Sequence, residues 1–139
     1  MHLPSPYGYI RAVHLDFDDA VARLEQALAE EGFGVLCRID LQAKLKEKLG
    51  VEFPRYIQLG ACNPRLAEQA LRHDLAIGLL LPCPAVVYQA DGRIFLGAVD
   101  AVRRLTAGAA SPDPALEALA RDINLHLQRA IDRAADARP

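Results

Sequence analysis

The sequence predicts an α+β domain with a single curved, mostly antiparallel sheet and helices packed mainly on one face. Three observations support this fold class. Strand and helix patterns alternate through the first half of the chain, a hairpin signal follows at residues 90–93, and the last strong pattern is one long helix. This order does not repeat a uniform β–α–β unit, which would favour a parallel sheet.

Residues 7–15 alternate and contain aromatic and β-branched side chains, so they predict a strand. Asp16 is the expected N-cap of the next helix, because a carboxylate at that position can accept a free backbone N–H. Apolar residues then recur at helical spacing, and Gly32 is the expected residue just past the end of the helix. Residues 33–40 predict a second strand, in which we expect Cys37 to lie in the core.

Asp40 is the expected cap of a short helix that ends at Gly50. Apolar residues recur every four positions in this helix: Leu41, Leu45 and Leu49. Residues 55–62 predict a third strand. Asn63 then has the character of an N-cap, and Pro64 suits the first helical position because its missing N–H would have no partner there.

The second half of the chain contains three apolar segments that predict strands: 77–82, 85–89 and 94–100. The first two flank a kink at Pro82–Pro84. Asp91 and Gly92 favour a type I′ hairpin turn. Residues 106–114 have the composition of a linker, and Ser111 with the following proline can start the last helix, at about 112–135.

The bulk properties restrict the function. A chain of 139 residues is expected to form one domain, 1–139. Its net charge of −2 argues against a general nucleic-acid-binding protein, which needs a basic surface. No segment approaches the roughly 20 apolar residues that span a bilayer, and residues 1–10 lack the pattern of a signal peptide. Three cysteines do not suggest a disulfide framework. We therefore expect a cytoplasmic protein that binds neither nucleic acid nor membrane.

A set of short motifs lies between about residues 39 and 100: Asp40, Lys48-Leu49-Gly50, Gly60-Ala61-Cys62-Asn63-Pro64, Ala67, Ala70-Leu71 and Leu79-Leu80-Leu81-Pro82-Cys83. In this combination the segment resembles the family called domain of unknown function 302. The resemblance implies an α+β fold like the saddle of the TATA-binding protein, and a homodimer, as in bacterial and archaeal members. It implies no established activity and no known cofactor, and a likeness to a DNA-binding saddle is not evidence for DNA binding.

The chain departs from the family pattern at two positions. Pro84 follows the second motif cysteine, where the family usually has asparagine, so a polar side chain and a backbone N–H are missing beside Cys83. Ala101 stands where the family usually has proline. If the family uses the asparagine in a site, the site of this member is altered.

Cys62 and Cys83 are the candidates for thiol chemistry. Cys62 directly precedes a predicted helix, whose free N–H groups and dipole can stabilise a thiolate. If the two cysteines face each other across neighbouring strands, they could form a reversible disulfide, or hold a metal with His73 as a third ligand. The spacing matches no zinc signature, however. Free cysteine is also among the most buried residue types, so both can simply be small core residues.

The same segment has the residues for binding an anion. Asn63, Arg65 and the first backbone amides of the helix could hold a carboxylate or phosphate. Lys44 and Lys48 are four residues apart on another helix and could add positive charge. Asn63 also has a structural explanation as a cap, and the lysines could lie on a solvated face.

Three hypotheses follow from the sequence. The first is a homodimeric module that binds a small ligand, with an anion as the suggested class, near Cys62, Asn63, Arg65, Cys83, Lys44 and Lys48. The second is a thiol-based redox or metal-binding protein that uses Cys62 and Cys83. The third makes the motif a packing element at the rim of the sheet or at a dimer interface. No catalytic residue can be assigned from the sequence.

Overall fold

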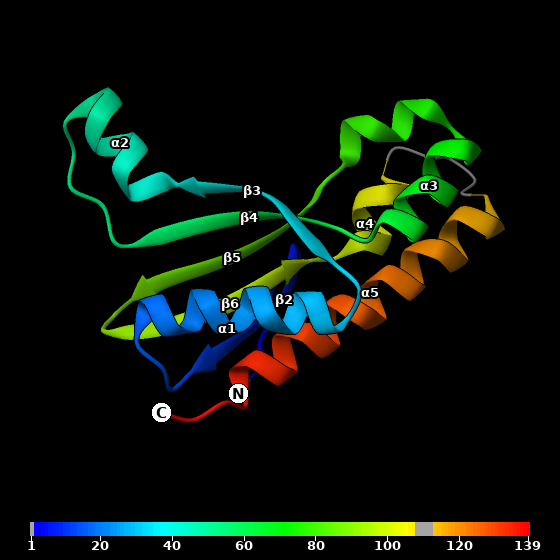
Figure 1. Cartoon of the computed structure of the whole chain (residues 1–139). Helices are drawn as coiled ribbons and strands as arrows, with labels where there is room; N and C mark the ends of the chain where they lie inside the picture. Colours follow the sequence, from blue (N-terminus) through cyan, green and yellow to red (C-terminus); the bar gives the residue numbers. More distant parts are fainter. Residues whose placement is uncertain (1, 108–112) are drawn as a thin grey trace.

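A six-stranded antiparallel sheet, in the order β1-β2-β6-β5-β4-β3, forms the centre of the molecule (Figure 1). The computed structural model describes residues 2–107 and 113–139. The strands are β1 (His2–Leu3), β2 (Gly8–Val13), β3 (Gly34–Asp40), β4 (Tyr56–Cys62), β5 (Cys83–Ala90) and β6 (Arg93–Val99). All neighbouring strands of this sheet pair antiparallel. The predicted α+β class with an antiparallel sheet is therefore confirmed.

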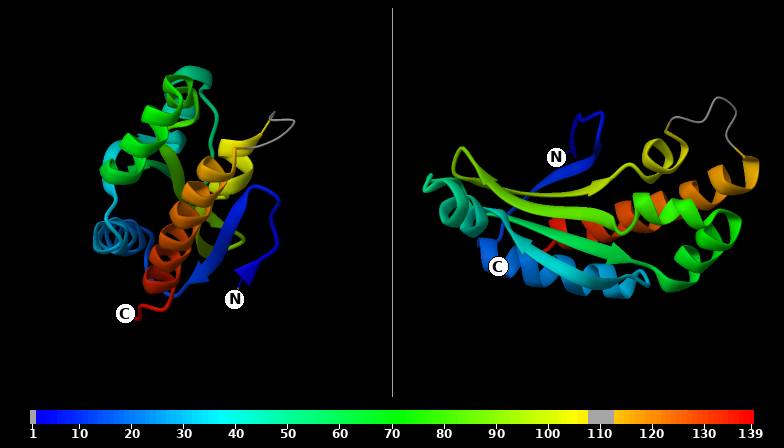
Figure 2. Two further views of the ribbon diagram at one scale, coloured as in Figure 1. Left: turned by 90° about the vertical axis from the view of Figure 1, so that its right-hand side faces the viewer. Right: turned by 90° about the horizontal axis from the view of Figure 1, so that it is seen from above.

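Helices α1 (Phe17–Glu30) and α5 (Pro114–Ala135) cover one face of the sheet (Figures 1 and 2). Both helices have an apolar side with helical spacing, as the sequence predicts, and this side is buried against the strands. The largest fully buried side chains in this layer are Leu24, Leu28, Leu59, Val87, Leu96, Leu127 and Ile131. Burying each such side chain stabilises the fold by about 1.5–3 kcal/mol.

The remaining helices lie at the two ends of the sheet. Helix α2 (Leu41–Leu49) stands at one end, and α3 (Pro64–His73), the 3₁₀ helix η1 (Leu75–Leu80) and α4 (Ala101–Thr106) stand at the other. Both ends rise beyond the strands, so the face opposite α1 and α5 is concave (Figure 2). Within the described residues, no helix lies across this concave face. The predicted packing of helices mainly on one face is confirmed.

Two elements near this end differ from the prediction. Residues 77–82 do not form a strand, because Asp74 starts a tight turn: its Oδ1 accepts from the N–H of Ala76 at 2.9 Å, and its carbonyl accepts from Ile77 at 3.0 Å. Helix α4 was not predicted. It begins where Asp100 accepts a hydrogen bond from the N–H of Arg103.

Most predicted helix ends are confirmed. The side chain of Asp40 accepts from the N–H of Ala43, and Gly32 and Gly50 have φ angles of +89° and +67°. Asp16 occupies the N-cap position of α1, but its side chain makes no capping hydrogen bond. Helix α5 is capped by Asp113, whereas the predicted start at Ser111 lies outside the described residues.

The hairpin between β5 and β6 has positive φ angles at both central residues, 52° at Asp91 and 73° at Gly92. A type I′ turn requires this combination, so the predicted turn chemistry is confirmed. On the far side of the sheet, polar contacts fasten α5 to its neighbours. The hydroxyl of Tyr9 on β2 donates to Asp132 at 2.6 Å, and Glu31 after α1 lies 2.9 Å from both His126 and Arg133. These contacts hold α5 against the covered face of the sheet.

Candidate functional site

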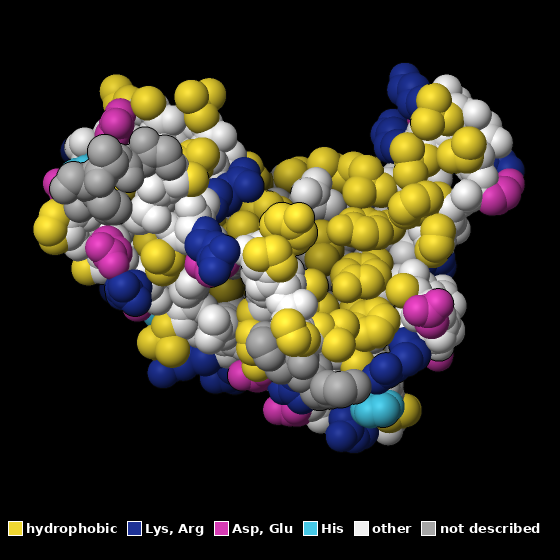
Figure 3. Space-filling view, turned by 180° about the vertical axis from the view of Figure 1, so that it is seen from behind, with side chains coloured by type: hydrophobic (Ala, Val, Ile, Leu, Met, Phe, Trp, Pro, Cys, Tyr) yellow, Lys and Arg dark blue, Asp and Glu magenta, His cyan; other side chains and the backbone are white. Residues whose placement is uncertain are grey.

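The concave face of the sheet is apolar. Directly paired residues on neighbouring strands share a face, so the pairs Tyr56–Tyr88 and Tyr88–Phe95 lie opposite the core residues Val87 and Leu96. The three rings stack in a row across β4, β5 and β6, with ring centroids 5.5 and 5.4 Å apart. Figure 3 shows this face as a broad hydrophobic area between two raised ends.

A hollow of about 320 Å³ lies on this face. Its lining includes Tyr7, Ile10, Tyr56, Pro84, Val86, Tyr88 and Gly97. Pockets that bind small molecules usually measure about 300–1,000 Å³ and are mostly apolar with a few polar groups. A Cβ atom on Gly97 would lie 3.1 Å from Ile10 and 3.3 Å from Val86, so glycine gives the hollow its depth.

The phenol groups of Tyr56 and Tyr88 are among the polar groups that line the hollow, together with the hydroxyls of Ser5 and Tyr7. Burial raises the pKa of both phenols, and Tyr56 raises that of Tyr88 further. Both therefore stay neutral hydrogen-bond donors at neutral pH. Within the part of the chain that the structure describes, neither hydroxyl has a hydrogen-bond partner. They are available to orient a ligand.

The sequence patterns do not predict this surface. One signal was present: residues 84–88 are apolar at every position, although a strand with one solvated face would alternate. Helices cover only one face of the sheet. The side chains at the alternate positions Val86 and Tyr88 therefore need another apolar partner.

The predicted motif lies at the rim of the sheet, where β4 meets α3. The side chain of Asn63 accepts a hydrogen bond from the N–H of Leu66 at 3.3 Å, and Pro64 occupies the first turn, so both predicted capping roles are confirmed. Gly32 packs against the same amide, because a Cβ on Gly32 would lie 3.0 Å from Asn63 Nδ2. Asn63 is thus committed to local structure through its side-chain oxygen.

Cys62 and Cys83 line the same cavity, so the structure brings the two motif cysteines together. The cavity measures about 10 Å³, which is the space of one water molecule at most. Both thiols are free. Burial raises the pKa of Cys62, and it raises the pKa of Cys83 to about 11 despite the opposing charge of Arg104. At neutral pH both sulfurs remain protonated, which is the weakly nucleophilic state.

Cys37 does not lie in the core, as the sequence had suggested; it is exposed. Strand β3 is at the edge of the sheet and has a bulge between Val35 and Cys37. The extra residue reverses the alternation of side chains between the two faces of the sheet from that point on. Cys37 therefore lies on the concave face, over Gly60 and beside Pro82.

The predicted cations are divided between the two ends of the sheet. Arg65 is exposed in the first turn of α3, whereas Lys44 and Lys48 are exposed on α2. The two ends are separated by the length of β4, about 20 Å for seven residues. His73, the third predicted metal ligand, is the last residue of α3, about 15 Å along the helix from its start, and lies 3.7 Å from Asp113. One chain alone does not assemble the predicted anion-binding set.

Both departures from the family pattern have structural consequences. Pro84 lines the hollow, so it places an apolar ring where an asparagine amide would otherwise stand. Ala101 is fully buried, and its N–H donates to Asn124 Oδ1 at 2.5 Å. A proline at position 101 could not donate this hydrogen bond.

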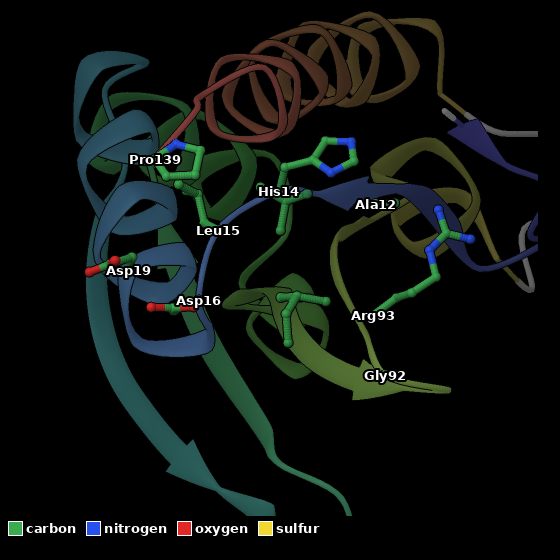
Figure 4. Close-up of a pocket in the computed structure, with 10 residues that line it drawn as sticks. Ala12, His14, Leu15, Asp16, Asp19, Gly92, Arg93 and Pro139 are labelled. Carbon is green, nitrogen blue, oxygen red and sulfur yellow. The ribbon is translucent and has the colours of Figure 1, made fainter.

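A second hollow, of about 400 Å³, lies at the opposite rim, between the end of β2, the start of α1 and the β5–β6 turn. Figure 4 shows its charged side chains far apart: Asp16 and Asp19 lie on the α1 side, Arg93 lies across the hollow, and His14 is directed away from both aspartates. This arrangement does not converge on a single point, so we assign no site there.

Metal ligands do not cluster in the described residues, where no three His, Cys, Asp or Glu side chains are placed to share an ion. None of the helices in residues 2–107 and 113–139 has the length and hydropathy that a membrane span requires.

Comparison with known proteins defines the family. No curated protein matches the chain. The chain is similar to an uncharacterized conserved protein from Bacillus stearothermophilus, whose crystal structure matches with a TM-score of 0.85 and 35% sequence identity over 94% of this chain and 99% of that one. The family model "Domain of unknown function DUF302" matches residues 9–134. The chain therefore belongs to the DUF302 family, as its motifs suggested.

Proposed function

We propose that this protein is a homodimeric module that binds a small ligand on its concave sheet face. The observation that carries the proposal is the uncovered apolar face with its hollow of about 320 Å³. No reaction is assigned to it. The cytoplasmic location expected from the sequence remains a prediction.

The chemistry of the hollow favours a ligand with a flat, apolar body. Aromatic side chains bind such groups through offset or edge-on contacts worth about 0.5–1.5 kcal/mol beyond area burial. Tyr56 and Tyr88, which both line the hollow, offer this surface, and their phenol groups offer hydrogen bonds at its edge. Val86 and Ile10 supply the aliphatic part of the lining.

The extent of the exposed surface favours a dimer. A folded monomer of 15.2 kDa is expected to expose about 7,100 Å². This chain exposes 7888 Å². This chain therefore exposes about 800 Å² more than an average monomer of its mass. Large exposed apolar patches on soluble proteins also mark interaction sites.

The thiol hypothesis has less support than ligand binding. Its two cysteines lie in a cavity too small for a substrate, and burial disfavours both thiolates. The small anionic ligand that the sequence suggests remains compatible with the proposal, because Arg65, Lys44 and Lys48 are all exposed.

Ligand binding can be tested with 1-anilinonaphthalene-8-sulfonate, a fluorescent probe with an aromatic body. We expect saturable binding that is lost in Val86→Glu, because the carboxylate would stand in the hollow. Leu125→Glu, a substitution on the surface of α5 at a residue 46% exposed, is the matched control and should bind normally. Equal binding by both variants would contradict the proposed ligand site.

The dimer can be tested separately by light scattering over a range of protein concentrations. We expect twice the mass of one chain for the wild type and for Leu125→Glu. A wild-type protein that is monomeric at every concentration would contradict the homodimer and leave the ligand test standing.

A further inference from the structure

Helix α2 and the segment after it, residues 41–55, form an arm that packs poorly on its own chain. No residue of α2 is buried. Leu49, Val51 and Phe53 remain 68%, 42% and 40% exposed. The arm holds its own shape, since Gln42 Nε2 donates to the carbonyl of Phe53 at 2.8 Å. An amphipathic helix whose apolar side meets solvent requires an apolar partner.

The opposite end of the sheet has a second uncovered apolar group. Leu75 and Leu79 on η1 are 84% and 86% exposed. Figure 3 shows the two raised ends on either side of the hydrophobic floor. The chain thus carries an apolar arm, an apolar floor and an apolar far end. These three surfaces can cover one another only between two copies.

We infer that in the dimer the arm of each copy crosses to the η1 end of its partner and closes the partner's hollow, so that each ligand site contains residues of both copies. The inference rests on the proposed homodimer. This arrangement is produced by a two-fold axis that runs between the two facing sheets, parallel to their planes and perpendicular to their strands. Such an axis exchanges the two ends of the sheet.

The hollow extends to the end of the sheet that the partner's arm would reach. Pro84 and Val99, which line it, lie at the ends of β5 and β6 that adjoin η1 and α4. Tyr56 and Tyr88, which also line it, lie at the other end, so the hollow runs along β5 between the two ends of the sheet. An arm arriving from the partner reaches that end.

Charge also favours the crossed arrangement. Residues 41–55 contain four cations and two carboxylates, Glu47 and Glu52, which gives a net charge of +2. Residues 63–82 contain two arginines and two carboxylates, with no net charge if His73 is neutral. Packing arm against arm would therefore oppose like charges, whereas packing arm against η1 would not.

The crossing has a consequence for the ligand. It places Lys44 and Lys48 of the partner subunit at the end of the sheet that carries Asn63 and Arg65. The two halves of the predicted anion-binding set lie about 20 Å apart in one chain, but the dimer brings them to one end. Asn63 and Arg65 do not line the hollow itself, so the charge that the crossing adds to the ligand site is that of Lys44 and Lys48 of the partner subunit. The ligand class is then a small molecule with an apolar body and an anionic group.

Cysteine cross-linking distinguishes the arrangements. In a Cys37→Ser background, which removes the exposed native thiol, we would prepare Leu49→Cys, Leu79→Cys and the double variant, and treat each with a short bismaleimide. We expect a covalent dimer only from the double variant, with a 49–79 link found by peptide mass spectrometry. Leu49→Cys with Leu125→Cys is the control and should give no dimer.

Three outcomes separate the two proposals. A 49–79 link between copies supports the crossed arm. A covalent dimer from Leu49→Cys alone, or a dimer in light scattering without the 49–79 link, overturns the crossed arm and leaves the homodimer intact. A monomer in light scattering overturns both.

The ligand class has its own readout. Lys44→Gln with Lys48→Gln should weaken binding of the anionic probe 1-anilinonaphthalene-8-sulfonate but not of its neutral analogue N-phenyl-1-naphthylamine. Lys46→Gln, on the same helix, is the matched control. Equal loss for both probes, or no loss for either, overturns the anionic part of the inference.

Discussion

The sulfur of Cys37 lies directly over Gly60: a Cβ atom at position 60 would stand 2.5 Å from Sγ and 2.8 Å from Pro82 Cγ. The side chain of Cys37 on β3, the backbone of Gly60 on β4 and the ring of Pro82 after η1 therefore meet at one point, where any side chain at position 60 would force its neighbours to shift. This contact joins the motif at the rim to the concave face.

Gly60→Ala should lower the free energy of unfolding by about 1–3 kcal/mol, the usual cost of overpacking. Gly34→Ala on β3 is the control, because its Cβ would meet only the carbonyl of Cys62 at 3.9 Å. Chemical denaturation measures both. Adding Cys37→Ala should restore part of the loss, and the absence of any loss in Gly60→Ala would show that the contact relaxes freely.

The three thiols should react with a maleimide in the order Cys37, Cys62, Cys83. Cys37 is exposed, Cys62 is half-buried, and burial raises the pKa of Cys83 to about 11. Mass spectrometry of the native protein at neutral pH gives the order directly. Labelling of Cys62 before Cys37 would contradict this order and would support the thiol hypothesis.

Asp100→Asn should reduce stability at neutral pH by about 0.3–1 kcal/mol, because it removes a negative charge from the start of α4. Burial alone would raise the pKa of Asp100, but hydrogen bonds from Asn124 and from the N–H of Arg103 and Val102 hold it below its ordinary value. The lowered pKa adds stability above the unfolded-state pKa of about 3.9, and this stability is lost as the pH falls through the folded pKa. Denaturation curves of both proteins should therefore converge in acid; a constant difference would contradict the assignment.

Asp132→Ala should cost about 1–3 kcal/mol, because Asp132 accepts hydrogen bonds from Tyr9 at 2.6 Å and from Arg11 at 3.0 Å. Asp122→Ala on the same helix is the control and should change stability by at most about 0.5 kcal/mol. Burial and the hydrogen bond to Asp132 raise the pKa of Tyr9 above its ordinary value. The stability that neutral Tyr9 contributes is therefore fully present below the unfolded-state pKa of about 10, and it is lost as the pH rises through the folded-state pKa. Denaturant midpoints measured at neutral and alkaline pH test both statements, and equal costs for the two variants would contradict the first.

The sequence predicted the layers of the fold well because periodicity and capping are local signals. Asp40, Asn63 and Gly32 occupy their expected positions. The predicted strand at residues 77–82 was wrong, because a short apolar run does not distinguish a strand from a tight helical turn. The side chain of Asp74 accepts a hydrogen bond that stabilises the turn. Helix α4 is only six residues long and has too few apolar positions for a periodic signal.

The candidate site was harder to predict. The sequence left open whether Cys62 and Cys83 lie close together, and the structure places both on the same small cavity. The hollow depends instead on which alternate positions of four strands remain uncovered, and that follows only from the placement of α1 and α5. The leucine stripe of α2 was predicted correctly as a pattern, but no residue of this helix is buried within the described chain.

The bulge in β3 has a consequence for assembly. An edge strand exposes a row of backbone donors and acceptors, and a regular edge can recruit another chain and grow without limit. The extra residue between Val35 and Cys37 breaks the even spacing of that row. A second copy is thereby hindered from pairing with the edge, whereas in the proposed dimer association through the concave face would close after two chains and would not grow into a fibre.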